Sequence, residues 1–162
     1  MNAARFNMLE NEIALKFAKR FANAGMAIHQ SSLPRATQEL VALRVSQING
    51  CGWCVDMHVK EAAAAGETAV RLALVAVWRE STVFTEAERA ALALAEEGTR
   101  LADAHEGVSD GTWERVREHF DDDRTAALVS LVALVNAANR LAVIAHQRGG
   151  SYEPGMFAAV LG

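Results

Sequence analysis

Cysteine and proline are scarce in this chain, whose 162 residues include two of each. Two cysteines cannot form a disulfide framework, and a chain of this length can bury a hydrophobic core without covalent cross-links. Two prolines leave long stretches in which a helix is not interrupted. No linker-like segment divides the sequence, so we expect one domain over residues 1–162 that is held together by packing.

A strong charge of either sign is also lacking. The formal net charge is −4, the sequence pI is about 5.7, and acidic and basic residues are mixed along the chain. Nucleic acids and anionic membranes bind proteins through clustered basic residues, and the sequence has no such cluster. We therefore expect neither nucleic acid nor a membrane as a partner.

A secretory signal and a membrane span are lacking as well. Residues 1–17 have neither the basic start nor the uninterrupted apolar stretch of a signal peptide. The longest apolar tract, residues 126–138, contains Ser130 and Asn136 and is too short to cross a bilayer. These features predict a buried helix and a cytoplasmic protein. In that compartment closely spaced cysteines are more often redox-active or metal-binding than structural.

Strand-like alternation is missing, and apolar residues recur at intervals of three and four instead. The sequence thus predicts an all-α fold of about seven helices. Gly50 can adopt the left-handed conformation that ends a helix, Thr85 begins one with a capping-box pattern, and Gly149-Gly150 is expected to end the last. We expect helices at roughly residues 7–30, 36–49, 51–65, 67–78, 85–103, 109–119 and 122–147.

The predicted helix at 122–147 is apolar on almost every side. Such a helix needs burial all round, and a 162-residue monomer offers few positions of that kind. We therefore expect a subunit interface and a homo-oligomer. Asn136, Asn139 and Arg140 interrupt the apolar surface, and they are expected to form a hydrogen-bonded polar cluster in the core or the interface.

The two cysteines form a CxxC pair, Cys51 and Cys54, and a histidine follows at His58. On a helix with 100° per residue these three side chains lie within an arc of about 60°, so they share one stripe. The start of a helix favours a thiolate because its free N–H groups and its dipole stabilise negative charge. His58, one turn after Cys54, can transfer a proton directly or through water. The stripe predicts a nucleophilic thiol with a resolving partner.

Glu39 lies on the preceding helix, whose apolar residues surround most of its circumference. A buried carboxylate is costly unless it is paired or neutral. If the turn at Gly50 folds this helix back, Glu39 reaches the cysteine stripe, and a raised pKa would suit proton transfer near neutral pH. The alternative is a surface glutamate in the first helical turn, stabilised by the helix dipole.

The pattern Glu39-x11-Cys51-x2-Cys54-x3-His58 resembles the active-site signature of the alkylhydroperoxidase D-like proteins of the carboxymuconolactone decarboxylase superfamily. The resemblance extends over about residues 35–147, and the later stretches VWRESTVFTEAERAALALAE and VNAANRLAV are similar to the peroxidase-related subgroup. It implies an all-α helical bundle that assembles as trimers or hexamers and reduces hydroperoxides with thiols, without a cofactor or metal.

The resemblance also assigns roles. Cys54 would attack the peroxide, Cys51 would resolve the sulfenic acid to a disulfide, and Glu39 and His58 would move protons. The reductant would be a thiol, such as a lipoyl-bearing or thioredoxin-like partner. Some family members carry a second histidine just before the second cysteine, where this chain has Trp53. Trp53 cannot act as a base, so it either covers the thiols or is an ordinary packed aromatic residue.

Three alternatives remain open. Glu39, Cys51, Cys54 and His58 could bind zinc, but three of these residues lie on one short helical stretch, unlike the paired knuckles of structural zinc sites. Decarboxylase chemistry gives the superfamily its name, but that branch generally lacks the cysteine pair. The third alternative is a non-enzymatic redox sensor or partner-binding oligomer, which turnover of peroxide would separate from an enzyme.

Overall fold

The computed structural model describes residues 4–6 and 10–156, and within them it contains seven α-helices, two short 3-10 helices and no strand. The predicted all-α fold is therefore confirmed. The elements are α1 Glu12–His29, α2 Arg35–Ile48, α3 Gly52–Ala64, α4 Ala69–Leu74, η2 Val75–Glu80, α5 Glu86–Thr99, η3 Leu101–Asp103, α6 Asp110–His119 and α7 Asp122–Ile144.

Most predicted helix boundaries are correct because local capping determines them. Gly50 has a φ of 65°, as expected for the residue that separates α2 from α3. Thr85 and Glu88 form the complete capping box at the start of α5. Asp121 caps α7 by accepting a hydrogen bond from the Arg124 amide.

Three predicted helices differ from the structure in their extent or continuity. The helix predicted at 67–78 divides into α4 and η2, where Val77 leaves helical geometry with φ −125° and ψ 32°. The helix predicted to reach residue 103 ends at Thr99, before the separate turn η3. The helix predicted to reach residue 147 ends at Ile144, because His146 adopts a left-handed φ of 58° before the glycine pair begins. The predicted start at residue 7 lies outside the described residues, and α1 begins at Glu12 behind its cap Asn11.

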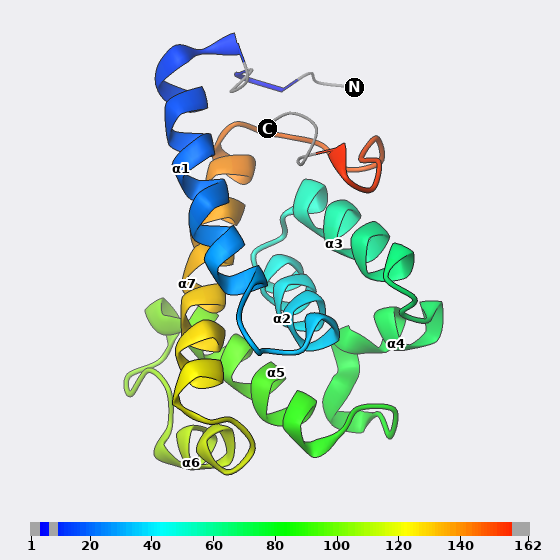
Figure 1. Cartoon of the computed structure of the whole chain (residues 1–162), viewed down its shortest axis with the longest axis vertical. Coiled ribbons are helices and arrows are strands. Elements are labelled where there is room, and N and C mark those ends of the chain that lie inside the picture. The colour runs from blue at the N-terminus through cyan, green and yellow to red at the C-terminus, as the bar shows by residue number, and fades with distance from the viewer. Residues whose placement is uncertain (1–3, 7–9, 157–162) are drawn as a thin grey trace.

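Helix α2 lies at the centre of the bundle, and α3, α5 and α7 pack around it (Figure 1). It is buried along most of its length, because its apolar residues do not keep to a single face. One cluster joins it to α5 and α7, and a second joins it to α3, η2 and α5. Helix α1 runs beside α7 on the outer edge of the bundle (Figure 1). The central position of α2 determines where Glu39 lies.

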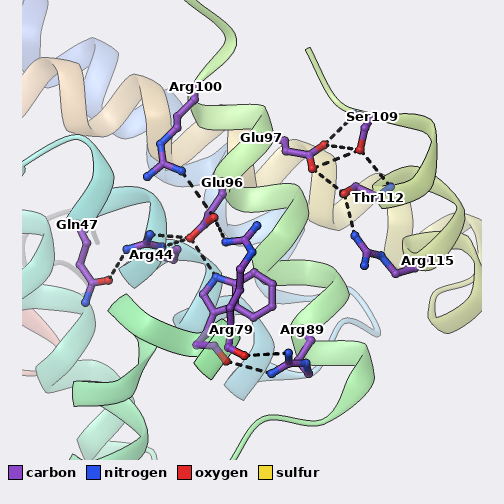
Figure 2. A network of polar contacts seen from close by, with 11 residues as sticks. Arg44, Gln47, Arg79, Arg89, Glu96, Glu97, Arg100, Ser109, Thr112 and Arg115 are labelled. Carbon is purple, nitrogen blue, oxygen red and sulfur yellow. Dashed lines mark hydrogen bonds and ion pairs between the residues drawn. The ribbon is translucent and has the colours of Figure 1, made fainter. Parts of the chain in front are cut away.

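Two glutamates of α5 connect it to its neighbours (Figure 2). Glu96 accepts hydrogen bonds from Arg44 of α2, with Nε–Oε1 2.7 Å, and from the Trp78 indole, with Nε1–Oε1 3.0 Å. Glu97 accepts a hydrogen bond from the Thr112 hydroxyl of α6 at 2.7 Å. Buried polar groups are therefore paired across helices, and they hold α2, η2, α5 and α6 in register.

Helix α7 is the one helix of the described residues that is long and apolar enough to cross a membrane by length and composition. In the fold it instead packs against α1, α2 and α5. Its polar residues form the expected cluster, in which Asn49 donates to the side-chain oxygens of Asn136 and Asn139 at 3.0 and 2.9 Å. Arg140 donates to the Asn136 carbonyl at 3.0 Å. These contacts are those of a core helix in a bundle.

Candidate active site

The two cysteines lie at the start of α3 and form a disulfide, with their Cα atoms 5.3 Å apart. Cys51 is the N-cap residue, and its sulfur accepts a hydrogen bond from the Cys54 amide at 3.3 Å. Both cysteines are buried, at 1% and 3% exposure, in a small cluster with Ala142 of α7 and Trp53. A thiolate formed here would receive the stabilisation that a helix N-terminus provides.

His58 and Glu39 come together from different helices. His58 follows Cys54 by one turn of α3, so the two side chains share a face. Its Nδ1 lies 2.8 Å from Oε2 of Glu39 on α2, whose side chain is only 7% exposed. The expected return of α2 toward α3 is therefore observed, and the alternative of a surface glutamate is wrong.

The charge state of Glu39 differs from the expectation. Burial by itself would raise the pKa of this carboxyl, as predicted from the apolar character of α2. The hydrogen bond from His58 and the positive charges of His58 and Arg35 outweigh burial, so the pKa of Glu39 is lowered. Glu39 is thus a carboxylate at neutral pH, and the predicted raised pKa is wrong.

Comparison with known proteins identifies the family. Residues 14–97 match the model of the carboxymuconolactone decarboxylase family. The chain belongs to this family. The uncharacterized protein YdfG of Bacillus subtilis (strain 168) is 36% identical over 140 residues, which are 86% of this chain and 94% of YdfG.

Two further relatives are alkylhydroperoxidase D-like. The alkyl hydroperoxide reductase AhpD of Rhodopseudomonas palustris (strain BisB18) is 43% identical over 76 residues, 43% of this chain and 41% of that protein. The crystal structure of ATU0492 from Agrobacterium tumefaciens, a protein of unknown function and candidate antioxidant defence protein AhpD, superposes with a TM-score of 0.85. It is 33% identical, and the match covers 93% of this chain and 100% of that one. The protein is therefore an AhpD-like member of the carboxymuconolactone decarboxylase family.

Arg35 is a member of this AhpD-like site that the sequence reasoning missed. Its Nη2 lies 2.5 Å from Oε1 of Glu39, on the side of the carboxylate opposite His58. The guanidinium also contacts the ring of His29, at the end of α1. Burial and the nearby charge of Arg35 lower the pKa of His29, so this ring is neutral at neutral pH. The contact between Arg35 and Glu39 could have been predicted from their i,i+4 spacing on one helix, whereas the contact with His29 could not, because it depends on how α1 packs.

The outer face of α3 is partly covered by another segment of the chain. Lys60 and Asp56 form an i,i+4 ion pair on this face, at 2.9 Å. Yet both also bind the chain that follows α7, where Asp56 accepts hydrogen bonds from the amides of Gly150 and Tyr152 at 2.6 and 3.0 Å. The Tyr152 ring lies edge-on to Trp53, with centroids 5.8 Å apart. A C-terminal segment that sequence reasoning did not connect to the site therefore lies on α3.

The structure gives no support to a zinc site in the part of the chain that it describes. Within those residues, no group of three or more His, Cys, Asp and Glu side chains is placed to hold a metal ion. The thiols are bonded to each other, and Glu39 is engaged by Arg35 and His58. The chemistry that these groups can carry out is proton transfer and thiol–disulfide exchange.

Proposed function

We propose that this protein is a thiol-dependent peroxidase that reduces hydroperoxides through Cys51 and Cys54. The observation that supports it most is the placement of the disulfide at the start of α3, one turn before a histidine that is bonded to a carboxylate. Similarity to the AhpD of R. palustris supports the same reaction class. YdfG, which matches 86% of the chain, is uncharacterized, so the proposed activity depends mainly on the geometry of the site.

The reaction uses two thiols and one peroxide. The Cys54 thiolate attacks the terminal oxygen of the hydroperoxide, the O–O bond breaks, and an alcohol leaves with a proton. The Cys51 thiolate then attacks the Cys54 sulfenic sulfur, which releases water and forms the disulfide. An external dithiol reduces the disulfide and returns both thiols. The order of attack follows the resemblance to AhpD-like proteins.

Glu39 and His58 supply the proton transfers. An ionised carboxylate can only accept a hydrogen bond, so the Nδ1 of His58 carries the proton toward Glu39. In the neutral ring, Nε2 is then free to take the proton of the attacking thiol and to return it to the leaving alkoxide. Glu39 therefore orients His58 and fixes its tautomer, rather than acting as a neutral acid.

Peroxide consumption tests the two-thiol mechanism. The assay follows loss of hydrogen peroxide and of an organic hydroperoxide with dithiothreitol as reductant, for the wild type and for Cys51→Ser and Cys54→Ser. We expect both variants to lose at least about a hundredfold in turnover, because each removes a bond-forming sulfur. A rate in either variant equal to that of the wild type would exclude the mechanism.

Substitutions at Glu39 and His58 test the proton transfer. Glu39→Gln and His58→Ala are expected to slow turnover by about a hundredfold or more and to change its pH profile, because general acid–base catalysis contributes at this scale. Circular dichroism and thermal melting check that both variants fold. If both variants kept wild-type rates at every pH, the proton-transfer role would be wrong.

A redox sensor that changes partners or assembly with its disulfide is the second candidate, since it would use the same buried cysteine pair. Multiple turnovers of peroxide per protein molecule favour the enzyme. A single stoichiometric oxidation, accompanied by a change in mass on light scattering, favours the sensor.

A further inference from the structure

The chain after α7 crosses directly over the start of the cysteine helix. We name residues 149–155 the C-terminal strap, and Figure 1 shows this segment passing over the N-terminal end of α3. The crossing is tight at Gly149, where an added Cβ would meet the Gly52 carbonyl oxygen and lie 2.9 Å from its carbonyl carbon. Gly52 directly follows Cys51 and is the first of the two residues between the cysteines. Only glycine therefore permits this close approach beside the disulfide.

Three side chains on the outer face of α3 hold the strap in place. Asp56 accepts hydrogen bonds from the amides of two strap residues. Lys60 donates to the Tyr152 carbonyl at 2.8 Å. Glu61 accepts hydrogen bonds from the Tyr152 hydroxyl and from the Gly155 amide, the latter at 2.8 Å. The strap is thus attached to the cysteine helix by a set of polar contacts along the outer face of α3.

The side chain of the strap residue Tyr152 is connected to the cysteine pair through Trp53. Tyr152 is 1% exposed, and its ring packs edge-on against Trp53. Trp53 in turn packs against the cluster formed by Cys51, Cys54 and Ala142. Burial and the Glu61 carboxylate raise the pKa of the Tyr152 phenol, so it remains a hydrogen-bond donor at neutral pH. Tyr152 and Trp53 therefore form two successive aromatic layers outside the disulfide.

We propose that the C-terminal strap is a gate over the Cys51–Cys54 disulfide, and that the strap must lift from α3 before a reductant can reach the sulfurs. The disulfide is buried, and attack by a thiolate needs a clear line to one sulfur along the S–S axis. Reduction therefore depends on how often the Asp56, Lys60 and Glu61 contacts open, and a bulky dithiol is hindered more than a small one. The inference deepens the proposed peroxidase function because it concerns the reductive half of the cycle.

Gly149→Ala is the sharpest test, because its methyl group is incompatible with the closed strap and touches neither sulfur. The oxidised protein is mixed with dithiothreitol or with thioredoxin, and free thiols are followed over time. We expect Gly149→Ala to be reduced about tenfold faster than the wild type by dithiothreitol, and by a larger factor with thioredoxin, since a few lost hydrogen bonds change an opening equilibrium by this much. Gly111→Ala, whose added methyl meets open space on α6, is the matched control and should be reduced at the wild-type rate.

Hydrogen exchange at the amides of Gly150 and Tyr152 measures directly whether the strap is bound to α3 or detached. These amides should be protected in the wild type and exposed in Gly149→Ala. Asp56→Ala removes the acceptor of both amides and is the second opening variant, while Glu153→Gln, an exposed strap residue, controls for the lost charge. Wild-type reduction rates in both opening variants would overturn the gate.

Chemical reduction needs no peroxidase turnover, so the two proposals fail separately. If the protein does not consume peroxide but its disulfide is reduced faster in Gly149→Ala, the gate is supported and the peroxidase function is excluded. If the protein consumes peroxide but its disulfide is reduced at the same rate with or without the strap contacts, the peroxidase function is supported and the gate is excluded.

Discussion

The two oxygens of the Glu39 carboxylate serve different partners. Oε1 binds Arg35, and Oε2 binds Nδ1 of His58. Arg35 thus stabilises the carboxylate of Glu39 from one side, while Nδ1 of His58 meets the other oxygen.

Removal of Arg35 should therefore change the pH dependence of turnover. In Arg35→Gln the pKa of Glu39 loses one of its lowering charges, so Glu39 takes up a proton at a higher pH than in the wild type. We expect the acid limb of the rate profile to move to higher pH, by a modest amount because Arg35 is partly exposed.

Arg35→Lys is the matched control, because it retains the charge and should restore most of the wild-type profile. An unchanged acid limb in Arg35→Gln, with normal folding, would show that Arg35 does not influence the charge on Glu39.

At the scale of elements, the buried Glu96 holds α2 and η2 against α5. Burial by itself would raise the pKa of Glu96, but hydrogen bonds from Arg79, Arg44 and Trp78 outweigh it and lower the pKa below the ordinary 4.5. A carboxyl with a depressed pKa contributes stability above its ordinary pKa, and that stability is lost as the pH falls through the lowered value in the folded state. This contribution is therefore complete at neutral pH.

Glu96→Gln should destabilise the protein by about 3 kcal/mol at pH 7, because it leaves Arg44 largely buried without a counter-charge. Urea denaturation at fixed protein concentration measures the change. Glu86→Gln, which removes an exposed carboxylate with a weak contact to Arg89, should change the free energy of unfolding by less than about 0.5 kcal/mol. Equal effects of the two substitutions, or a Glu96→Gln protein whose stability falls in acid as the wild type does, would contradict this role.

At the scale of the whole molecule, α7 packs on one side and leaves apolar residues uncovered on the other. Val143 and Ile144 are 45% and 71% exposed, and Ile13 and Phe17 of the adjacent α1 are 79% and 48% exposed. Exposed apolar residues grouped on neighbouring elements are typical of protein interfaces. They are consistent with the homo-oligomer predicted from the sequence of α7, which remains a prediction.

Light scattering at micromolar protein should give three or six times the chain mass of 17.4 kDa. Ile144→Glu should lower this mass, because a charge on the apolar surface opposes association. Val70→Glu, an equally exposed apolar position on α4, is the control and should leave the mass unchanged. A wild-type mass of 17.4 kDa would contradict the interface.

Within helices, the sequence determined nearly everything by itself. Apolar spacing and caps such as Thr85–Glu88 act over three or four residues, so the helices and the shared face of Cys54 and His58 could be predicted without the fold. The predicted end of the last helix differs from the structure because His146 adopts a left-handed φ of 58° before the glycines begin.

Only the tertiary structure decided which residues of different helices contact each other. The charge on Glu39 depends on Arg35 of the same helix and on His58 of α3, and the contact with His58 exists only because α2 and α3 pack together. The strap depends on contacts between residues more than 90 positions apart, such as Asp56 and Gly150, which no local pattern encodes. Packing determines which charged residues and which segments lie beside the cysteine pair, and these neighbours limit its access to solvent.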